Sequence, residues 1–321
     1  MRPPARQQTP QSHTPLNRDA RTDPPDPHLT TRTPKANALK TILLQLDSGD
    51  SASVFDSVVA VNAGTDVLLQ RHGVTADNVV PHVHGCIFTR GPKDLRNTAI
   101  FLGGDDVPAV DAIAKAVRGA FFGPMRVSVL VDPNGSNTTA AAAVHLASKH
   151  VEADAPAVVL GSGPVGGRVA RMCAGRGRPV TILGRDAGRS RVAADAVAET
   201  IGSDAAPLSG AAYGTPEAAA ALREGRVLYA CGKAGVELMA DWRDHDFAVA
   251  VDLNAVPPAG LPGIEAGDFA EDRGGTLCYG AIGVGGPKMK LHKAAIRSLF
   301  ESNDRFLDAE EVLELAGEVI G

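Results

Sequence analysis

The sequence predicts an α/β protein with a Rossmann-type parallel-sheet dinucleotide domain and an N-terminal α/β domain that is completed by C-terminal helices. From Thr41 onward, short apolar strands alternate with longer helical stretches, which is the pattern of parallel sheets. At residues 157–166 an apolar strand runs into a glycine-rich turn and a helix, the unit that holds a dinucleotide. A length of 321 residues is natural for two domains.

The N-terminal domain is expected over residues 38–152. Proline, threonine and arginine dominate residues 1–37 with almost no apolar anchors, so we expect a disordered tail there. Beyond the tail, the apolar pattern predicts strands at 42–46, 99–102 and 127–131 and helices at 53–59 and 107–121.

The dinucleotide domain is expected over residues 153–286. A polar segment at 134–139 precedes an alanine-rich helix, which Ser136 or Asn137 can cap. Residues 287–321 are expected to form two helices that return to the N-terminal domain. The remaining predicted elements are strands at 157–160, 180–183, 227–230 and 248–251 and helices at about 288–300 and 308–319.

The composition favours small-molecule partners. The formal net charge is −5 with interspersed signs, which gives no basic surface for nucleic acid or an anionic membrane. No apolar run reaches the roughly 18 residues that span a bilayer, and the N-terminus lacks the apolar core of a secretory signal. We therefore expect a cytoplasmic protein. The four cysteines are far apart and fit free thiols in a reducing compartment.

Metal and hydrolase chemistry are disfavoured. His82 and His84 have the spacing of a metal pair on a strand, but no third ligand of matching spacing is evident. We interpret them as surface or interface histidines and predict no metal. The turn at 161–163 lacks the Gly-x-Ser-x-Gly pattern of a nucleophilic serine.

The glycine-rich turn is the predicted cofactor loop. Gly161 permits the tight turn, Gly163 lets backbone N–H groups approach a pyrophosphate, and Gly166 allows the helix to pack close to the strand. The helix N-terminus adds a favourable field for the anion. The predicted contacts are Gly161, Ser162, Gly163, Pro164, Val165 and Gly166.

The end of the next strand bears on the choice of dinucleotide. Arg185 offers a cation to the 2′-phosphate of NADP, and Arg189 and Ser190 follow within reach of the same group. Asp186 can bind a ribose hydroxyl instead. NADP is favoured, and NAD stays possible.

Two other polar clusters allow more than one interpretation. Residues 136–139 either face a cleft and orient a heterocyclic ligand or only cap a helix. Lys288 and Lys290 follow a glycine-rich connection at 283–286 and begin a predicted helix, where the helix field disfavours cations. They then need a partner such as a cofactor phosphate, a ligand carbonyl or a carboxylate, unless they are surface lysines.

Several motifs together resemble one family. The most specific are Asn-Gly-Ser-Asn-Thr-Thr at 134–139 and Gly-Gly-x-Lys-x-Lys-Leu-His at 285–292. Ser-Val-Phe-Asp at 53–56, Thr-Arg-Gly at 89–91 and Phe-Phe-Gly-Pro at 121–124 add to them. With the glycine loop, these motifs make the chain from about Leu39 to its C-terminus resemble the bacterial NADP-dependent methylene-tetrahydromethanopterin dehydrogenases.

The resemblance implies an activity and a substrate site. The methylene bridge of a reduced pterin is oxidised to the methenyl cation, and the hydride passes to the nicotinamide. The carrier is tetrahydromethanopterin, tetrahydrofolate or both, and the enzyme is a homo-oligomer, a trimer or a hexamer. Phe55, Thr139 and Lys288 match pterin-site positions, where Lys288 positions the ring or tunes the charge near it.

Hydride transfer from an N–CH2–N carbon needs no proton transfer, so alignment of the two carbons does most of the catalysis. A carboxylate such as Asp56 can stabilise the developing cation, although a helix-surface or ion-pair role for Asp56 is equally open.

One position and one segment depart from the family pattern. Asp186 stands where members often have a lysine, which keeps NAD open. The segment Cys-Gly-Lys-Ala-Gly at 231–235, with Cys231, Gly232 and Lys233, replaces a more apolar segment near the expected nicotinamide. Lys233 can therefore contact a phosphate or ribose. The alternatives are a methylene-tetrahydrofolate dehydrogenase and a non-catalytic NADP(H)-sensing regulator.

Overall fold

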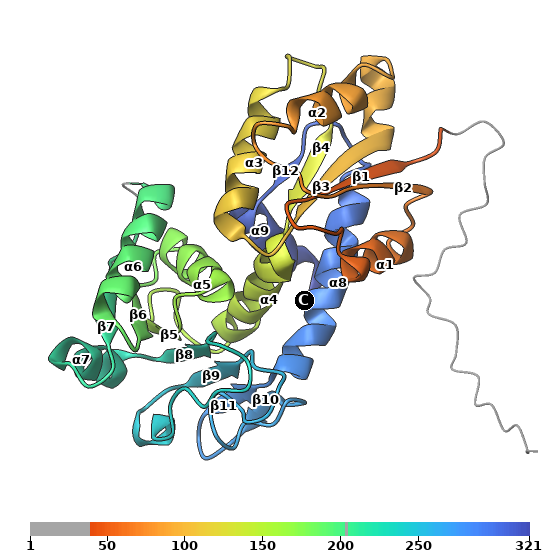
Figure 1. The fold of residues 1–321 in the computed structure, drawn as a ribbon. Coiled ribbons are helices and arrows are strands. Elements are labelled where there is room, and N and C mark those ends of the chain that lie inside the picture. The colour runs from red at the N-terminus through yellow and green to blue at the C-terminus, as the bar shows by residue number, and fades with distance from the viewer. Residues whose placement is uncertain (1–38, 203–204) are drawn as a thin grey trace, which may run out of the picture. The chain divides into compact units, whose positions relative to one another are not determined.

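Two sheets organise the computed structural model, which describes residues 39–202 and 205–321 (Figure 1). The predicted tail at residues 1–37 lies outside the described residues. Strands and helices alternate through most of the described chain, so the predicted α/β class is confirmed. The residue boundaries expected for the domains stay predictions.

The first sheet has five strands, all parallel, in the order β12-β4-β3-β1-β2. Apolar side chains of β1 and β3 pack in two different clusters, one on each face, which explains why these strands are continuous apolar runs. The elements are β1 (Ile42–Asp47), α1 (Val54–Asn62), β2 (Val67–Arg71), α2 (Val80–Ile87), η1 (Pro92–Asn97), β3 (Thr98–Gly103), α3 (Val107–Gly119), β4 (Ser128–Val131), η2 (Pro133–Gly135) and β12 (Phe306–Leu307).

The second sheet has seven strands in the order β10-β11-β9-β8-β5-β6-β7, and only its β10–β11 pair is antiparallel. This order contains the arrangement of a dinucleotide-binding sheet. The elements are β5 (Ala157–Leu160), α5 (Pro164–Gly175), β6 (Val180–Gly184), α6 (Ala187–Ile201), β7 (Leu208–Ala212), α7 (Pro216–Glu224), β8 (Val227–Ala230), η3 (Trp242–Asp244), β9 (Val249–Asp252), β10 (Phe269–Asp272) and β11 (Leu277–Tyr279).

An alanine-rich helix, α4 (Ser136–Ser148), joins the two sheets through a shared core. It packs against α5, α8 (Ala281–Ser298) and α9 (Ala309–Val319), as Figure 1 shows. One buried apolar cluster runs from Phe101 of β3 through α4 to Val159 of β5. Because alanine side chains are small, they let the neighbouring helices approach closely.

The C-terminal residues return to the first sheet, as predicted. Phe306 and Leu307 of β12 pair with Val129 and Leu130 of β4, and α9 then packs on α4.

The seven predicted strands are confirmed, but three details of the helices were wrong. Gly135 is the N-cap of α4 and has no side chain to cap it, so neither Ser136 nor Asn137 acts as the N-cap. The glycine-rich stretch at 283–286 is not a connection, because α8 already begins at Ala281. A side chain at Gly283 would collide with the carbonyl oxygen of Asp268, so this glycine serves close packing.

The third detail concerns the two histidines placed on a strand. His82 and His84 lie on α2, where Pro81 stands in the first turn and Val83, Cys86 and Ile87 are buried at helical spacing. Strands β2, β7, β10, β11 and β12 and helices α2 and α7 were not predicted.

The tight packing of α4 gives a stability prediction. Ala142 has no exposed surface, so Ala142→Leu is expected to lower the free energy of unfolding by about 1–3 kcal/mol through overpacking. Ala196→Leu, at an exposed site on α6, is the control and is expected to change it by less than about 0.5 kcal/mol. Urea unfolding measures both, and equal effects would contradict the packing argument.

Candidate active site

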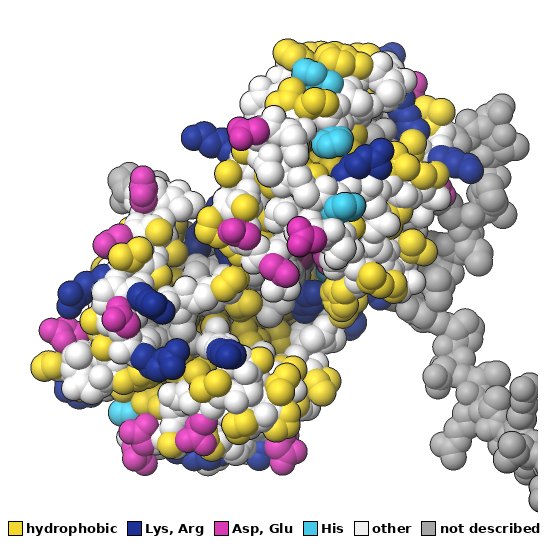
Figure 2. Space-filling view, viewed as in Figure 1, with side chains coloured by type: hydrophobic (Ala, Val, Ile, Leu, Met, Phe, Trp, Pro, Cys, Tyr) yellow, Lys and Arg dark blue, Asp and Glu magenta, His cyan; other side chains and the backbone are white. Residues whose placement is uncertain are grey.

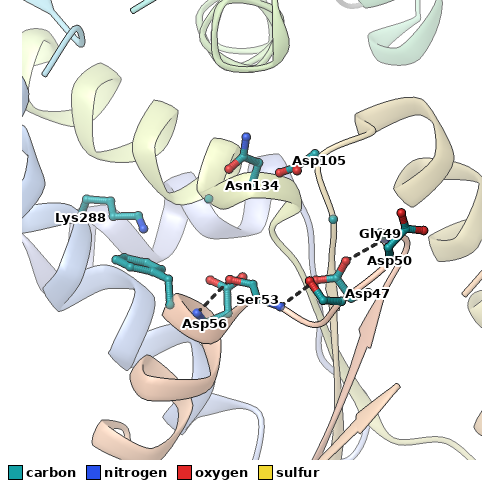
Figure 3. A pocket seen from close by; sticks show the side chains of 12 residues that line it. Asp47, Gly49, Asp50, Ser53, Asp56, Asp105, Asn134 and Lys288 are labelled. Atoms are coloured by element: carbon teal, nitrogen blue, oxygen red, sulfur yellow. Dashed lines mark hydrogen bonds between the residues drawn. The ribbon is translucent and has the colours of Figure 1, made fainter. Parts of the chain in front are cut away.

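A cavity of about 500 Å³ opens where β1 and β3 end (Figure 3). The strand order reverses at β1, which has β2 on one side and β3 on the other. Ligands of open α/β sheets bind beyond the carboxyl ends of the strands at such a point. The lining residues are Asp47, Gly49, Asp50, Ser51, Ser53, Phe55, Asp56, Gly104, Asp105, Asn134, Gly135 and Lys288.

Lys288 reaches the cavity from α8 and is only 8% exposed. Its side chain points across the cavity in Figure 3, and its Nζ lies 4.4 Å from the centre of the Phe55 ring. A buried ammonium group is costly unless something compensates its lost hydration. The face of the Phe55 ring is one such compensation, through a cation–π interaction.

Gly135 makes room for this lysine. The residue has a positive φ of 63°, and a Cβ atom there would lie 3.1 Å from the Lys288 Nζ. Lys288 lies inside α8 and not at its start, so the argument from the field of the helix N-terminus was wrong. Lys290 is exposed on the same helix, as in the surface-lysine interpretation.

Asp56 brings a second buried charge to the cavity and is 5% exposed. Burial, followed by the negative charge of Asp132, raises the pKa of Asp56 to about 6, while the Ser53 hydroxyl and the Lys288 ammonium act in the opposite direction. Ser53 is the N-cap of α1, where its Oγ accepts from the Asp56 N–H at 3.2 Å. A poorly hydrated carboxylate in this position can stabilise a cation.

The acidic loops after β1 and β3 were not predicted to belong to the site. Asp47 accepts from the N–H groups of Gly49 at 2.8 Å and Ser53 at 3.2 Å, and so fixes the loop between β1 and α1. Asp50 and Asp105 are exposed at the edge of the cavity. The sequence could have indicated them, because each acidic loop directly follows a predicted buried strand of the same sheet.

Asp132 organises the polar motif at 134–139 from a position with no exposed surface. Its carboxylate accepts from the N–H of Asn137 at 2.9 Å, the N–H of Thr138 at 3.1 Å and the Thr138 hydroxyl at 2.7 Å. These bonds satisfy backbone groups that the first turn of α4 leaves free. Asn137 and Thr138 therefore serve the helix start, whereas Asn134 and Gly135 line the cavity.

The structure thus brings three of the four predicted catalytic residues together. Phe55, Asp56 and Lys288 line the cavity, but Thr139 does not belong to its described lining. Thr139 is half-buried in the first turn of α4. Its role stays a prediction.

The predicted cofactor loop lies where the strand order of the second sheet reverses, between β5 and β8. Gly161 has a φ of 108°, and a Cβ atom there would lie 2.9 Å from the Cα of Gly232. A side chain at Gly166 would collide with the Gly161 carbonyl. Gly163 is the N-cap of α5 and supplies no side-chain cap, so the helix N-terminus can bind an anion.

The other predicted loop residues surround these glycines. Ser162 and Pro164 are exposed, Val165 is half-buried, Cys231 is buried and Lys233 is exposed. The residues present therefore fit a dinucleotide phosphate next to the backbone of this loop.

The residues after β6 divide into two groups. Arg185 and Arg189 have exposed side chains. Ser190 is buried, and its hydroxyl donates to the carbonyl of Asp186 at 3.1 Å. The Asp186 carboxylate caps α6 by accepting from the Arg189 N–H at 2.7 Å. The two guanidinium groups are therefore open to a phosphate, while Ser190 and Asp186 are engaged in the first turn of α6.

Tyr213 lies at the same edge and was missed. Its N–H donates to the Gly184 carbonyl at 3.0 Å, and the pairing of Gly184 with Ala212 places Tyr213 beside Arg185. Burial raises the pKa of Tyr213 to about 12, against the effect of the Arg185 charge, so its hydroxyl remains a donor. Figure 2 shows Lys and Arg side chains over the α6–α7 part of the molecule, mixed with Asp and Glu. The serine and glycine in β7 hid this strand from the sequence pattern.

A second cavity, of about 250 Å³, lies beside the end of β9 and the start of α8. Ala281 lines this cavity, and Lys288 lines the first one two turns later on the same helix. The lining residues are Asp252, Asn254, Ala255, Val256, Pro257, Ala259, Ile264, Glu265, Ala266, Gly280 and Ala281.

The remaining predictions concern metal ligands, the histidines of α2, the cysteines and membrane-spanning segments. No three His, Cys, Asp or Glu side chains of the described residues are grouped so that they could hold a metal ion. The His84 ring instead lies 5.2 Å from Phe88 and 5.7 Å from Phe122. All four cysteines are buried and free. Within 39–202 and 205–321, the helices are too short or too polar to cross a membrane.

Comparisons with known proteins place the chain among its relatives. Residues 54–134 match the family described as methylene-tetrahydromethanopterin dehydrogenase, N-terminal. The chain is 40% identical over 287 residues to the bifunctional protein MdtA of Methylorubrum extorquens, covering 87% of this chain and 99% of that protein. It is 32% identical over 301 residues to the NAD(P)-dependent methylenetetrahydromethanopterin dehydrogenase of the same organism, covering 88% and 99%. The solved shikimate dehydrogenase of Mycobacterium tuberculosis gives a TM-score of 0.46 at 16% identity, covering 86% and 99%.

The burial of Asp56 predicts a pH-dependent stability. Its folded pKa of about 6 lies above the unfolded value, so the folded state loses stability as pH rises through 6. Two pKa units correspond to about 3 kcal/mol, which Asp56→Asn is expected to recover at pH 8 but not at pH 4. Chemical unfolding at both pH values measures the difference. Asp105→Asn, at the exposed edge, is the control and is expected to change stability by less than about 0.5 kcal/mol at either pH. A gain for Asp56→Asn that is the same at both pH values would refute the assignment.

Proposed function

Because the chain belongs to the methylene-tetrahydromethanopterin dehydrogenase family, we propose that it transfers a hydride between methylene-tetrahydromethanopterin and NADP to give the methenyl pterin. An oxidoreductase of C1 metabolism with a pterin carrier as substrate follows from the family itself. The observation that carries the proposal is that α8 lines both cavities. Two helical turns span about 10 Å, a separation that suits two heterocycles that must meet.

The residues of the first cavity suit a pterin whose methylene carbon gives up a hydride. Phe55 offers an aromatic face to a heterocycle, and the Lys288 ammonium can hold the ring in place or tune the charge near it. The Asp56 carboxylate would stabilise the cation that develops between the two pterin nitrogens. No proton has to move in this reaction, so the reaction does not require a general base.

The second sheet supplies the proposed cofactor site. When bound, NADP supplies the carbon that accepts the hydride. Support comes from the open N-terminus of α5 after Gly163 for the pyrophosphate and from the exposed Arg185 and Arg189 for the 2′-phosphate. The capping role of the Asp186 carboxylate makes it a poorer partner for a ribose hydroxyl, which favours NADP over NAD.

We also propose a homo-oligomer, the trimer or hexamer that the family resemblance implies. Support comes from α1, which exposes Val54, Val58 and Val61 at 76%, 53% and 59%. Their spacing places the three side chains on one face of the helix, and an exposed apolar stripe of this kind is typical of association surfaces. The cytoplasmic location expected from the sequence stays a prediction.

Turnover of two carriers tests the proposed reaction. Methylene-tetrahydromethanopterin and methylene-tetrahydrofolate are each offered with NADP and with NAD, and formation of the reduced nicotinamide is followed by absorbance. We expect the highest kcat/KM with methylene-tetrahydromethanopterin and NADP. A higher value with the folate carrier would favour the methylene-tetrahydrofolate dehydrogenase, and no hydride transfer with any combination would exclude the enzyme.

Arg185→Ala tests the choice of cofactor. Loss of a charged hydrogen bond worth about 1.5–3 kcal/mol is expected to raise the KM for NADP by roughly 10- to 100-fold. The KM for NAD should stay nearly unchanged because NAD has no 2′-phosphate. Arg223→Ala removes an exposed guanidinium on α7 and is the control. Equal effects of Arg185→Ala on the two cofactors would refute the phosphate role.

A further inference from the structure

His292 has no exposed surface, and neither of its ring nitrogens has a hydrogen-bond partner among the described residues. A buried polar atom without a partner destabilises the folded state, because it gives up its hydrogen bonds to water. A phenylalanine would fill nearly the same space without that cost. Stability therefore does not explain why a histidine occupies this position.

The surroundings of His292 connect it to the first cavity. Its ring stacks on Phe101 at 5.8 Å and lies 6.4 Å from the Phe55 ring. Lys288 precedes it by one helical turn on the same face of α8. His292 thus lies behind the two residues that form the aromatic and cationic wall of the cavity.

The polar edge of the imidazole faces Asp132. The His292 Nε2 lies 3.9 Å from the Asp132 Oδ2, which is too far for a hydrogen bond but close for two groups without exposed surface. Asp132 in turn holds the first turn of α4 through Asn137 and Thr138. The contact therefore joins the polar motif at 134–139 to the lysine motif on α8.

We infer that His292 is a positioning residue, which holds Lys288 and Phe55 in register with Gly135 by stacking on Phe101 with its polar edge toward the Asp132 carboxylate. This inference rests on the proposed binding of the pterin in the first cavity. The imidazole stays neutral at physiological pH, because burial, and next the Lys288 charge, lower the pKa of His292 to about 4 despite the opposing charge of Asp132.

The test uses His292→Phe in the full-length enzyme. We expect a midpoint of thermal unfolding at or above that of the wild type, because the two unpartnered nitrogens are removed. We also expect kcat/KM for the methylene pterin to fall by about tenfold or more, with the KM for NADP within about twofold. A merely structural role predicts the opposite, a lower midpoint with normal turnover. Wild-type kcat/KM in this variant would overturn the inference.

His145→Phe is the matched control. The Nε2 of His145 on α4 is also buried without a partner, but His145 does not line either cavity. Its replacement is expected to leave kcat/KM unchanged.

A second variant keeps the test decisive if His292→Phe folds poorly. His292→Gln retains a polar group that can face Asp132, and it is expected to recover part of the lost kcat/KM. No recovery would overturn the inference. Lys288→Met distinguishes an error in the proposed pterin site from an error in the role of His292. If Lys288→Met has full activity, the proposed pterin site is wrong. If Lys288→Met is impaired while His292→Phe is fully active, only the role of His292 fails.

Discussion

The hydrogen bonds of Asp132 are the constraint on which the first cavity depends. A carboxylate with no exposed surface is tolerated because three donors from Asn137 and Thr138 surround it. These bonds fix the start of α4 directly after β4 and hold the intervening turn with Gly135 at positive φ. Since Lys288 lies against Gly135, the position of the ammonium group follows from a carboxylate outside the cavity. The same negative charge adds to the effect of burial in raising the pKa of Asp56.

The charges around the cavity are arranged for a substrate that becomes positive. Asp56 is costly to ionise in its buried place, and that cost means that its carboxylate has little water to screen it. A cation that develops nearby in the transition state would gain more from such a group than from a hydrated one. Lys288 reduces the cost from the other side of the cavity, with the Phe55 ring beneath its ammonium. Both groups therefore gain stabilisation from each other before any ligand arrives.

The sequence predicted the elements whose burial dictates their composition. Strands such as β1, β3 and β5 are buried on both faces, so each is a continuous apolar run that ends at a turn. The edge strand β7 contains Ser209 and Gly210 and carries little of this signal. The start of α8 was misjudged because helix propensity disfavours glycine, whereas packing of Gly283 on the Asp268 backbone requires it. Lys288 and Phe55 were predicted from motifs. The acidic loops resembled ordinary surface turns in the sequence, and they are recognised as part of the site only because β1 and β3 end at the same edge of the sheet.

The course of α8 shows why its sequence combines glycines with a lysine and a histidine. The helix starts at Ala281, beyond β11, where Gly283 lets it approach the Asp268 carbonyl, and it then carries Lys288 into the first cavity. A flexible linker at 283–286 would have left the distance between the two cavities variable. A continuous helix fixes that distance, and hydride transfer is sensitive to displacements of about 1 Å. Gly283 thus contributes to a fixed spacing of the two cavities through close packing, although glycine is usually associated with flexibility.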